Sequence, residues 1–204
     1  MRKIARLSLV AGAAAAVIGG AVVAAPSFAT PGGGECELSG TANFHPGPGT
    51  DPAGAFAYDF SGNLTNCGDS TGGPAGFGSI TGTITAGQTY VDANGGTHAE
   101  PVPTGTGSCA TGNTSGVSFV KWSDGTESVI SYQTTSAAAG VVLQGTVLSS
   151  YNLPDGTTVT STKYSGDGAA GVLAFEVSDP TQCNSAGGVT NAGIDGFTGL
   201  GSSS

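Results

Sequence analysis

Short stretches in which apolar and polar residues alternate recur along most of the chain. This period of two places every second side chain on the same face of a strand, so each stretch predicts a half-buried β-strand. The predicted strands cover residues 36–44, 56–64 with a continuation towards Cys67, 77–85, 117–122, 128–132, 140–148, 157–164, 171–177 and 189–197. In one of them Phe56, Tyr58 and Phe60 share a face, which is the pattern of a core stripe.

Segments rich in glycine, proline, asparagine and aspartate separate the predicted strands, notably residues 45–52, 66–74, 92–103 and 152–156. Asp124 and Gly125 lie between two β-rich runs, which favours a tight hairpin turn with positive φ. No stretch after residue 29 has helical periodicity. The pattern therefore predicts an all-β fold, an antiparallel sandwich or barrel of about eight to ten short strands with Gly-rich loops.

The first 29 residues have the three parts of an export signal. Residues 1–6 are basic, residues 7–25 form an apolar run, and Ser27 and Ala29 place small side chains before the expected cleavage site. An uncleaved membrane anchor is the alternative for this segment. Cleavage after Ala29 leaves a flexible lead-in at 30–35, a single domain at 36–200 and a tail at 201–204, and it predicts a secreted, extracellular protein.

All four cysteines, Cys36, Cys67, Cys109 and Cys183, follow the predicted cleavage site. An even number of cysteines in an exported chain predicts disulfides, here two. Cys36 begins one predicted strand and Cys67 ends the next, and these two ends are neighbours in an antiparallel hairpin. We therefore expect the pairs Cys36–Cys67 and Cys109–Cys183. A zinc site is the alternative, but the chain has no C-x-x-C pair and only two histidines.

Charge narrows the classes of partner. After cleavage the chain keeps Lys121 and Lys163, has no arginine and carries all 14 acidic residues, so its formal charge is −12. Nucleic acids and anionic lipid surfaces are bound through Lys and Arg, so neither is an expected partner. No later apolar run reaches the length of a membrane span, so we expect no membrane contact once the signal is removed.

Two glycine-containing segments match enzyme motifs at about the frequency that the glycine content produces by chance. Residues 68–72 fit the G-x-S-x-G pattern of serine hydrolases, and residues 166–171 fit the G-x-G-x-x-G pattern of dinucleotide-binding folds. Both motifs require a helix directly afterwards. Gly73 and Pro74 follow the first, and a strand pattern follows the second. We interpret both as loops, and the sequence assigns no catalytic residue.

The best metal candidate consists of Asp92, Asn94 and Glu100, whose oxygen atoms suit calcium. Asp and Asn are also ordinary turn residues, and the spacing of an EF-hand is absent. Calcium is therefore a weak candidate, and we expect no other cofactor. The two histidines, His45 and His98, lie in segments rich in proline and glycine and are interpreted as surface residues.

Trp122 and Tyr132 flank the predicted Asp-Gly turn and are the weak candidates for a binding site. Aromatic rings can stack on sugars, which would suit a glycan ligand. The simpler interpretation is a cross-strand pair within the hairpin.

A longer series of motifs runs through most of the chain after the signal. It comprises Cys36-x-x-x-Gly40 to Phe44-x-Pro46, Tyr58-x-Phe60-x-Gly62-x-Leu64-x-x-Cys67, Gly107-Ser108-Cys109-x-x-Gly112-x-x-x-Gly116, Trp122-x-Asp124-Gly125, and Cys183 with Gly188-Val189-Thr190-x-Ala192-Gly193. In these motifs the chain resembles a group of small secreted all-β proteins of high-GC Gram-positive bacteria. The resemblance implies export, two disulfides and an all-β fold, and it carries over no site residue.

Together these observations favour a secreted, non-catalytic β domain with a binding or structural role at the extracellular surface. Its candidate ligands are an apolar or neutral compound held in a barrel, a neutral glycan, the cell wall or a protein partner. One alternative is a secreted hydrolase that uses Asp or Glu on a glycan, which a carboxylate pair in a cleft would favour. The other is a secreted inhibitor or toxin acting on a protein, which an exposed loop beside a disulfide, such as residues 66–74, would favour.

Overall fold

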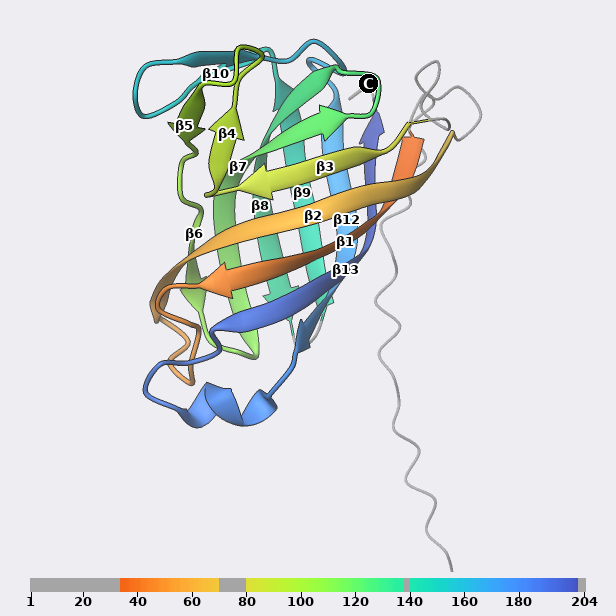
Figure 1. Cartoon of the computed structure of the whole chain (residues 1–204). Coiled ribbons are helices and arrows are strands. Elements are labelled where there is room, and N and C mark those ends of the chain that lie inside the picture. Colours follow the sequence, from red (N-terminus) through yellow and green to blue (C-terminus); the bar gives the residue numbers. More distant parts are fainter. Residues whose placement is uncertain (1–33, 70–79, 138–139, 202–204) are drawn as a thin grey trace, which may run out of the picture.

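The computed structural model describes residues 34–69, 80–137 and 140–201, and the predicted export signal lies outside this part of the chain. The described residues are mostly in strands, and the sole helix among them is a short 3-10 helix, η2 (Figure 1). The elements are β1 (Gly34–Phe44), β2 (Ala55–Asp69), β3 (Gly82–Ala86), β4 (Thr89–Val91), β5 (Thr97–Ala99), β6 (Thr104–Gly107), β7 (Thr111–Trp122), β8 (Glu127–Ala137), β9 (Gly140–Leu148), β10 (Ser150–Asn152), β11 (Thr158–Thr160), β12 (Gly168–Val177), η2 (Pro180–Asn184) and β13 (Asn191–Gly201).

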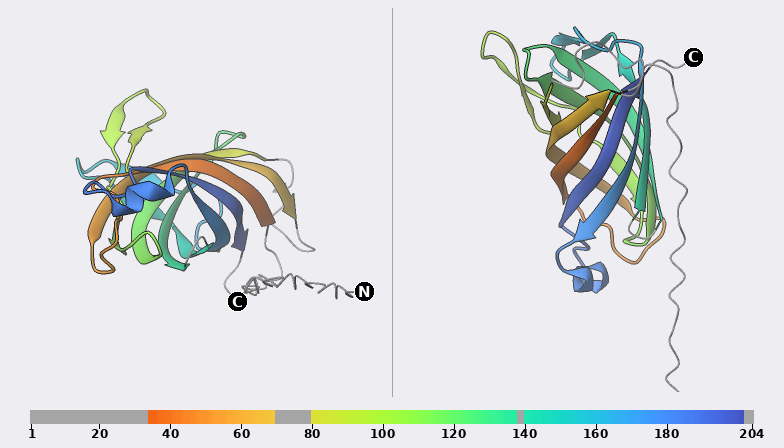
Figure 2. Two further views of the ribbon diagram at one scale, coloured as in Figure 1. Left: turned by 90° about the horizontal axis from the view of Figure 1, so that it is seen from below. Right: turned by 90° about the vertical axis from the view of Figure 1, so that its right-hand side faces the viewer.

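The long strands form one antiparallel sheet that closes on itself. Neighbours follow the order β1, β13, β12, β9, β8, β7, β3, β2, and β2 pairs with β1 again. Seen from below, the strands curve around a common interior (Figure 2). The predicted all-β antiparallel fold is confirmed, and the pairing of β2 with β1 decides for a barrel rather than a sandwich.

Two short strands, β3 and β6, share one position in the barrel wall. β3 pairs with residues 60–64 of β2 and residues 119–122 of β7. β6 pairs with residues 55–57 of β2 and residues 112–115 of β7. The segment between them leaves the wall and forms the β4–β5 hairpin. Sequence analysis predicted no strand at 104–107, because Thr-Gly-Thr-Gly contains no apolar residue that could reveal an alternation.

Alternation along each strand fills the interior, as the sequence predicted. The aromatic stripe Phe56, Tyr58 and Phe60 is buried. Inward-facing glycines on adjacent strands leave room for these rings: a Cβ at Gly105 would lie 2.5 Å from the Phe56 ring, and one at Gly40 would lie 2.6 Å from the Phe60 ring. An eight-stranded barrel is just wide enough for side chains. Glycine in the wall therefore makes the space in which large rings can be buried.

A second, smaller core lies outside the barrel wall. The outward-facing Phe119 of β7 and Val129 of β8 are covered by Tyr90 from the β4–β5 hairpin and by Leu153 and Val159, which flank and belong to the β10–β11 pair. All five side chains are buried. Both small hairpins lie at the upper end of the barrel in Figure 1. This end is therefore thickened by a second layer.

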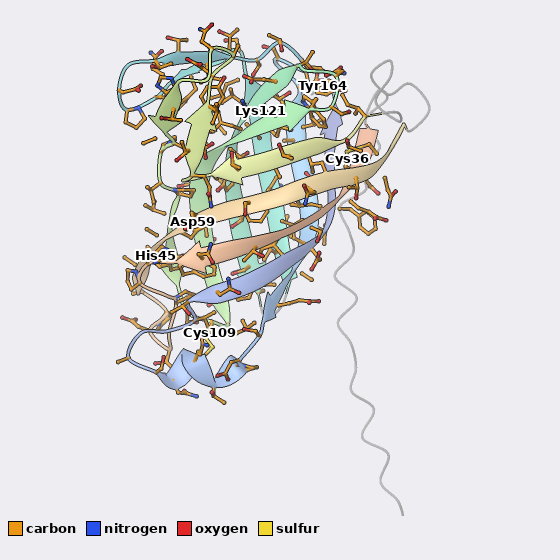
Figure 3. The ribbon with its side chains drawn as sticks, viewed as in Figure 1. Cys36, His45, Asp59, Cys109, Lys121 and Tyr164 are labelled. Atoms are coloured by element: carbon orange, nitrogen blue, oxygen red, sulfur yellow. A yellow bond between two sulfur atoms is a disulfide. The ribbon has the colours of Figure 1, made fainter. Side chains whose placement is uncertain are left out.

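Two disulfides lie at opposite ends of the barrel, and both predicted pairs are confirmed. Cys36–Cys67 joins the adjacent strands β1 and β2. Cys109–Cys183 joins the β6–β7 turn to η2, which lies below the barrel (Figure 3). Stable disulfides are typical of oxidising environments outside the cytoplasm. Within the described residues, no helix has the length and apolar character needed to cross a membrane.

Several predicted boundaries were wrong. Gly34 and Glu35 of the predicted lead-in already belong to β1, and the predicted loop at 66–74 begins as strand, because β2 continues to Asp69. β7 begins at Thr111, before its first apolar alternation. The helix η2 was missed, although Asp179 caps it by accepting a bond from the Thr181 amide and Pro180 begins it, a known start signal. Residues 70–79 lie outside the described part of the chain.

Candidate functional site: the barrel cavity

The lower half of the barrel interior contains a cavity of about 130 Å³. Residues from β1, β2, β3, β7, β8, β9, β12 and β13 line it. The upper half of the interior is filled by other side chains, among them Trp122, Ile80 and Leu64, which are all buried. The cavity is therefore a gap left between packed residues of one core.

Most of the cavity wall is hydrocarbon. Phe44 is the centre of an aromatic group, with its ring centroid 5.7 Å from those of Phe56 and Tyr58 and 5.8 Å from that of Phe175. Aliphatic side chains complete the wall, namely Leu38, Ile84, Ala86, Val141, Leu143, Leu173 and Ile194. Burial of apolar surface is the main driving force for ligand binding in such a space.

A chain of four hydroxyl groups runs along one side of the cavity. The Tyr132 Oη lies 2.8 Å from the Tyr58 Oη, which lies 3.0 Å from the Thr114 Oγ1. The Thr114 Oγ1 in turn lies 2.7 Å from the Thr134 Oγ1. All four residues line the cavity. They come from β8, β2, β7 and β8 again, so the closed barrel, rather than any one hairpin, brings them together.

Both phenols of this hydroxyl chain are neutral. Burial raises the pKa of Tyr58, although its hydrogen bonds with Thr114 and Tyr132 act in the opposite direction. Burial also raises the pKa of Tyr132 well above its ordinary value, and the neighbouring Tyr58 and the charge of Glu100 add to that shift. The cavity therefore offers hydroxyl donors and acceptors at every physiological pH.

The two lysines of the described chain form ion pairs with acidic side chains outside the cavity lining. The Lys121 Nζ donates to the Val91 carbonyl and lies 3.4 Å from the Glu127 Oε1. The Lys163 Nζ lies 2.6 Å from the Asp124 Oδ2. Among the described residues that line the cavity there is no Asp, Glu, His, Lys or Arg. The described lining of the cavity is thus uncharged, and both lysines are bonded to groups outside it.

The lower end of the cavity is formed by loops that are bonded to one another. Pro48, Ser108 and Cys109 line this end. The Cys109 amide donates to the Gly49 carbonyl, and the Val189 amide donates to the Pro48 carbonyl. The disulfide Cys109–Cys183 anchors η2 at the same end, as the position of Cys109 in Figure 3 shows.

Comparisons of the chain with protein-family models, with curated proteins and with solved structures find no match. The geometry of the chain's own residues is therefore what identifies the site.

The two weak binding candidates of the sequence stand apart in the structure. Trp122 is buried in the upper interior, where its Nε1 donates to the Ser128 Oγ at 2.9 Å. Tyr132 lies on the cavity wall, opposite Gly116 across the β7–β8 ladder. The two residues are therefore not the cross-strand pair that we predicted. Both rings are buried, which leaves neither exposed for stacking on a sugar.

The calcium candidates do not share one site. The Asp92 Oδ1 accepts the amides of Asn94 and Gly96 within its own turn. Glu100 is buried on the outer side of β3, where its carboxylate accepts bonds from the Thr85 hydroxyl and the Gln88 amide. Burial raises the pKa of Glu100, against the effect of these bonds. Among the described residues, no three His, Cys, Asp or Glu side chains form a group that could hold a metal ion.

His98 and His45 both lie close to carboxylates, and neither histidine is among the residues that line the cavity. The His98 Nδ1 lies 2.7 Å from the Asp155 Oδ2, and its Nε2 lies 3.3 Å from the Asp92 Oδ2. His98 therefore joins the two small hairpins at the upper end of the barrel. The exposed His45 lies 3.4 Å from the Asp59 Oδ2 on the outer face of the wall (Figure 3).

A broader depression lies on the outer face beside His45. It is lined mainly by exposed neutral side chains of β6, β7 and β8, including Thr104, Thr106, Asn113, Ser115, Gln133 and Thr135. These residues form two rows across the strands, because Thr104 faces Ser115 and Thr106 faces Asn113 in the ladder, and the same rows continue onto β8. The depression offers hydrogen-bonding groups without formal charge.

Three residues of the hydroxyl chain, Tyr58, Thr114 and Thr134, were not predicted as site residues from the sequence. Two of them could have been found from the alternation along their strands, which places them on the inward face. Tyr58 lies between Phe56 and Phe60, and Thr134 follows Ile130 and Tyr132 at the same period of two. A polar group at an inward position predicts a buried polar site. Thr114 carried no such signal, because its neighbours in sequence are also polar. The serine-hydrolase motif cannot be placed, because Ser70 lies outside the described residues.

Proposed function

We propose that this chain is a secreted, non-catalytic binding protein that holds a small apolar molecule inside its barrel. The observation that carries the proposal is the hydrocarbon-lined cavity of about 130 Å³ in the lower half of the barrel. A well-packed core leaves few voids larger than a water molecule. An apolar cavity of comparable size, about 150 Å³, is known to stay dry and to take up benzene. The ligand is therefore on the order of a single ring.

The proposal includes export, so that the protein binds its ligand outside the cell, and two features support this. The two disulfides fit an oxidising environment. The basic and apolar segments at residues 1–29 fit a signal that brings the protein there. The alternative hydrolase requires a pair of carboxylates, and the cavity lining contributed by residues 34–69, 80–137 and 140–201 contains no Asp or Glu.

The proposal is tested by titrating the mature protein with ethylbenzene and following binding by calorimetry and by thermal unfolding. We expect saturable binding with one site. At about 100 times the dissociation constant the ligand should add about 2.7 kcal/mol to the free energy of unfolding. Ala86→Leu should reduce the affinity at least tenfold, because Ala86 lines the cavity and the three added carbons occupy it.

Ala55→Leu is the matched control. Ala55 is exposed on β2, and the same change there leaves the cavity unaltered. Absence of binding by a panel of small apolar compounds would contradict the proposal. Equal affinity of the Ala86→Leu variant and the wild type would move the ligand out of the barrel.

A neutral glycan on the outer face is the second candidate. The observation in its favour is the uncharged depression beside His45, whose rows of threonine, serine and amide side chains match the hydroxyl groups of a sugar. Glycan binding that survives Ala86→Leu and is lost in Thr106→Val would favour this candidate, whereas no glycan binding would leave the cavity as the functional site.

A further inference from the structure

The hydroxyl chain limits what kind of molecule the cavity accepts, and this inference rests on the proposed function. Tyr132, Tyr58, Thr114 and Thr134 carry four hydroxyl protons, and the structure joins them by three hydrogen bonds. Each bond uses one proton, so one of the four protons is left over, and it lies at an end of the chain when all three bonds run in the same direction. Tyr132 and Thr134 are the two ends, and both line the cavity.

The direction of this chain is reversible, because either oxygen of each bond can be the donor. When Tyr132 donates to Tyr58 and each hydroxyl donates onward, Thr134 keeps the spare proton and the Tyr132 oxygen has free lone pairs. When all the bonds reverse, Tyr132 keeps the spare proton. Each end can therefore donate to an acceptor or accept from a donor. A ligand with a single carbonyl or hydroxyl oxygen satisfies an end in either direction.

The lack of a basic group in the described lining excludes ligands that combine an apolar ring with a carboxylate. A carboxylate in this cavity would be buried without a cation, because the described lining residues include no basic side chain and Lys121 and Lys163 are bonded to Glu127 and Asp124. The Tyr hydroxyls can donate to an anion, but a single spare proton does not replace its hydration. An unpaired buried charge costs far more than a buried hydroxyl that finds a partner.

We propose that the cavity selects neutral, single-ring molecules with one hydroxyl or carbonyl oxygen, which is held at the Tyr132 or Thr134 end of the hydroxyl chain. Such a ligand places its ring among Phe44 and its aromatic neighbours and its oxygen on the chain. Pure hydrocarbons fit the space and leave the spare proton without a partner. Ring carboxylates are rejected.

The test compares four ligands of nearly equal size by calorimetry at pH 7: benzyl alcohol, benzaldehyde, ethylbenzene and benzoate. We expect the alcohol and the aldehyde to bind at least as tightly as ethylbenzene, although water holds their oxygen atoms more strongly. Benzoate should bind at least about 100-fold more weakly than the alcohol. The ratio of alcohol to ethylbenzene affinity is the measured quantity.

Tyr132→Phe and Thr134→Val each remove one end of the hydroxyl chain with little change of shape. The variant at the end that holds the ligand's oxygen should lower the ratio about 2- to 10-fold through loss of one hydrogen bond, with the affinity for ethylbenzene unchanged. Tyr151→Phe is the control, since Tyr151 packs against the outer core and not the cavity. The ethylbenzene affinity also shows whether each variant is folded.

The outcomes separate the two proposals. Ethylbenzene that binds while the alcohol and the aldehyde bind more than tenfold more weakly would overturn this inference and leave the proposed function intact. Benzoate that binds as tightly as the alcohol would do the same, as would an unchanged ratio in Tyr132→Phe, Thr134→Val and the double variant. Failure of all four ligands would overturn the proposed function itself.

Discussion

At the scale of single residues, glycine and aromatic residues act as pairs in the barrel wall. Gly105 lies against the ring of Phe56, and Gly40 lies against the ring of Phe60, each from an adjacent strand. A Cβ atom at either glycine would displace the ring. The sequence shows both members of each pair, but it does not show that they meet. This is why the glycine content suggested long loops, although many of the glycines lie within strands.

Gly105→Ala is expected to destabilise the protein by about 1–3 kcal/mol, because the added methyl group overpacks the core against the Phe56 ring. Gly68→Ala is the matched change, since Gly68 also lies in a strand and a Cβ there would have no atom within 4 Å. The measurement is the free energy of unfolding in denaturant. Equal losses in both variants would contradict a special packing role for the contact of Gly105 with the Phe56 ring, because backbone entropy by itself makes Gly→Ala stabilising.

At the scale of elements, the structure separates what local pattern can predict from what it cannot. The β7–β8 hairpin was predicted because Asp124 and Gly125 form its turn, where Gly125 has φ +82°. The pair Cys36–Cys67 was predicted because the two cysteines lie at neighbouring ends of predicted strands, and Cys109–Cys183 was the pair that remained. β6 and the first half of β7 were missed, because their Thr, Gly, Asn and Ser residues are held by pairing with neighbouring strands and show no apolar period.

The contact between the two small hairpins is an element-scale feature that should respond to pH. Hydrogen bonds with Asp155 and then Asp92 raise the pKa of His98 above its ordinary value of 6.5. Asp155 has its pKa lowered to about 2, chiefly by the hydrogen bond with His98. Tyr90 and Thr157 are the other neighbours of the imidazole.

The pKa shifts of His98 and Asp155 determine the pH range in which their contact stabilises the folded protein. A raised histidine pKa means that the stabilisation is fully present below pH 6.5 and is lost as the pH rises through the folded-state value. The lowered Asp155 pKa means that its share is present above its ordinary value of 3.8 and is lost as the pH falls towards about 2. The contact is therefore strongest between these limits.

Between pH 5.5 and pH 9, His98→Gln is expected to lower the unfolding temperature most at the acid end, and the difference should shrink as the pH rises through the raised pKa of His98. Thermal unfolding of both proteins across this range gives the difference, and the NMR titration of His98 gives its pKa directly. His45→Gln is the control, because His45 is exposed and belongs to neither of the two small hairpins. A constant difference at all pH values would mean that His98 acts by packing alone.

At the scale of the whole molecule, closure of the barrel creates the site. Tyr58 and Tyr132 are 74 positions apart in the sequence, and Tyr58 and Thr114 are 56 apart, yet their hydroxyls form one chain. The sequence left sandwich and barrel open, because both require the same alternation of inward and outward residues. Without the closing pair of β2 with β1, the inward-facing residues could not be assigned to a common cavity. The sequence proposed Tyr132 as a binding candidate for the stacking capacity of its ring, whereas in the structure its hydroxyl takes part in the chain on the cavity wall.

The most direct measurement for the whole account is a crystal structure of the mature protein grown with benzyl alcohol. We expect ligand density inside the lower half of the barrel, with the ring beside Phe44 and the oxygen within hydrogen-bond distance of the Tyr132 or Thr134 hydroxyl. A cavity that is filled by protein side chains, or that stays empty while the ligand binds elsewhere on the surface, would contradict it.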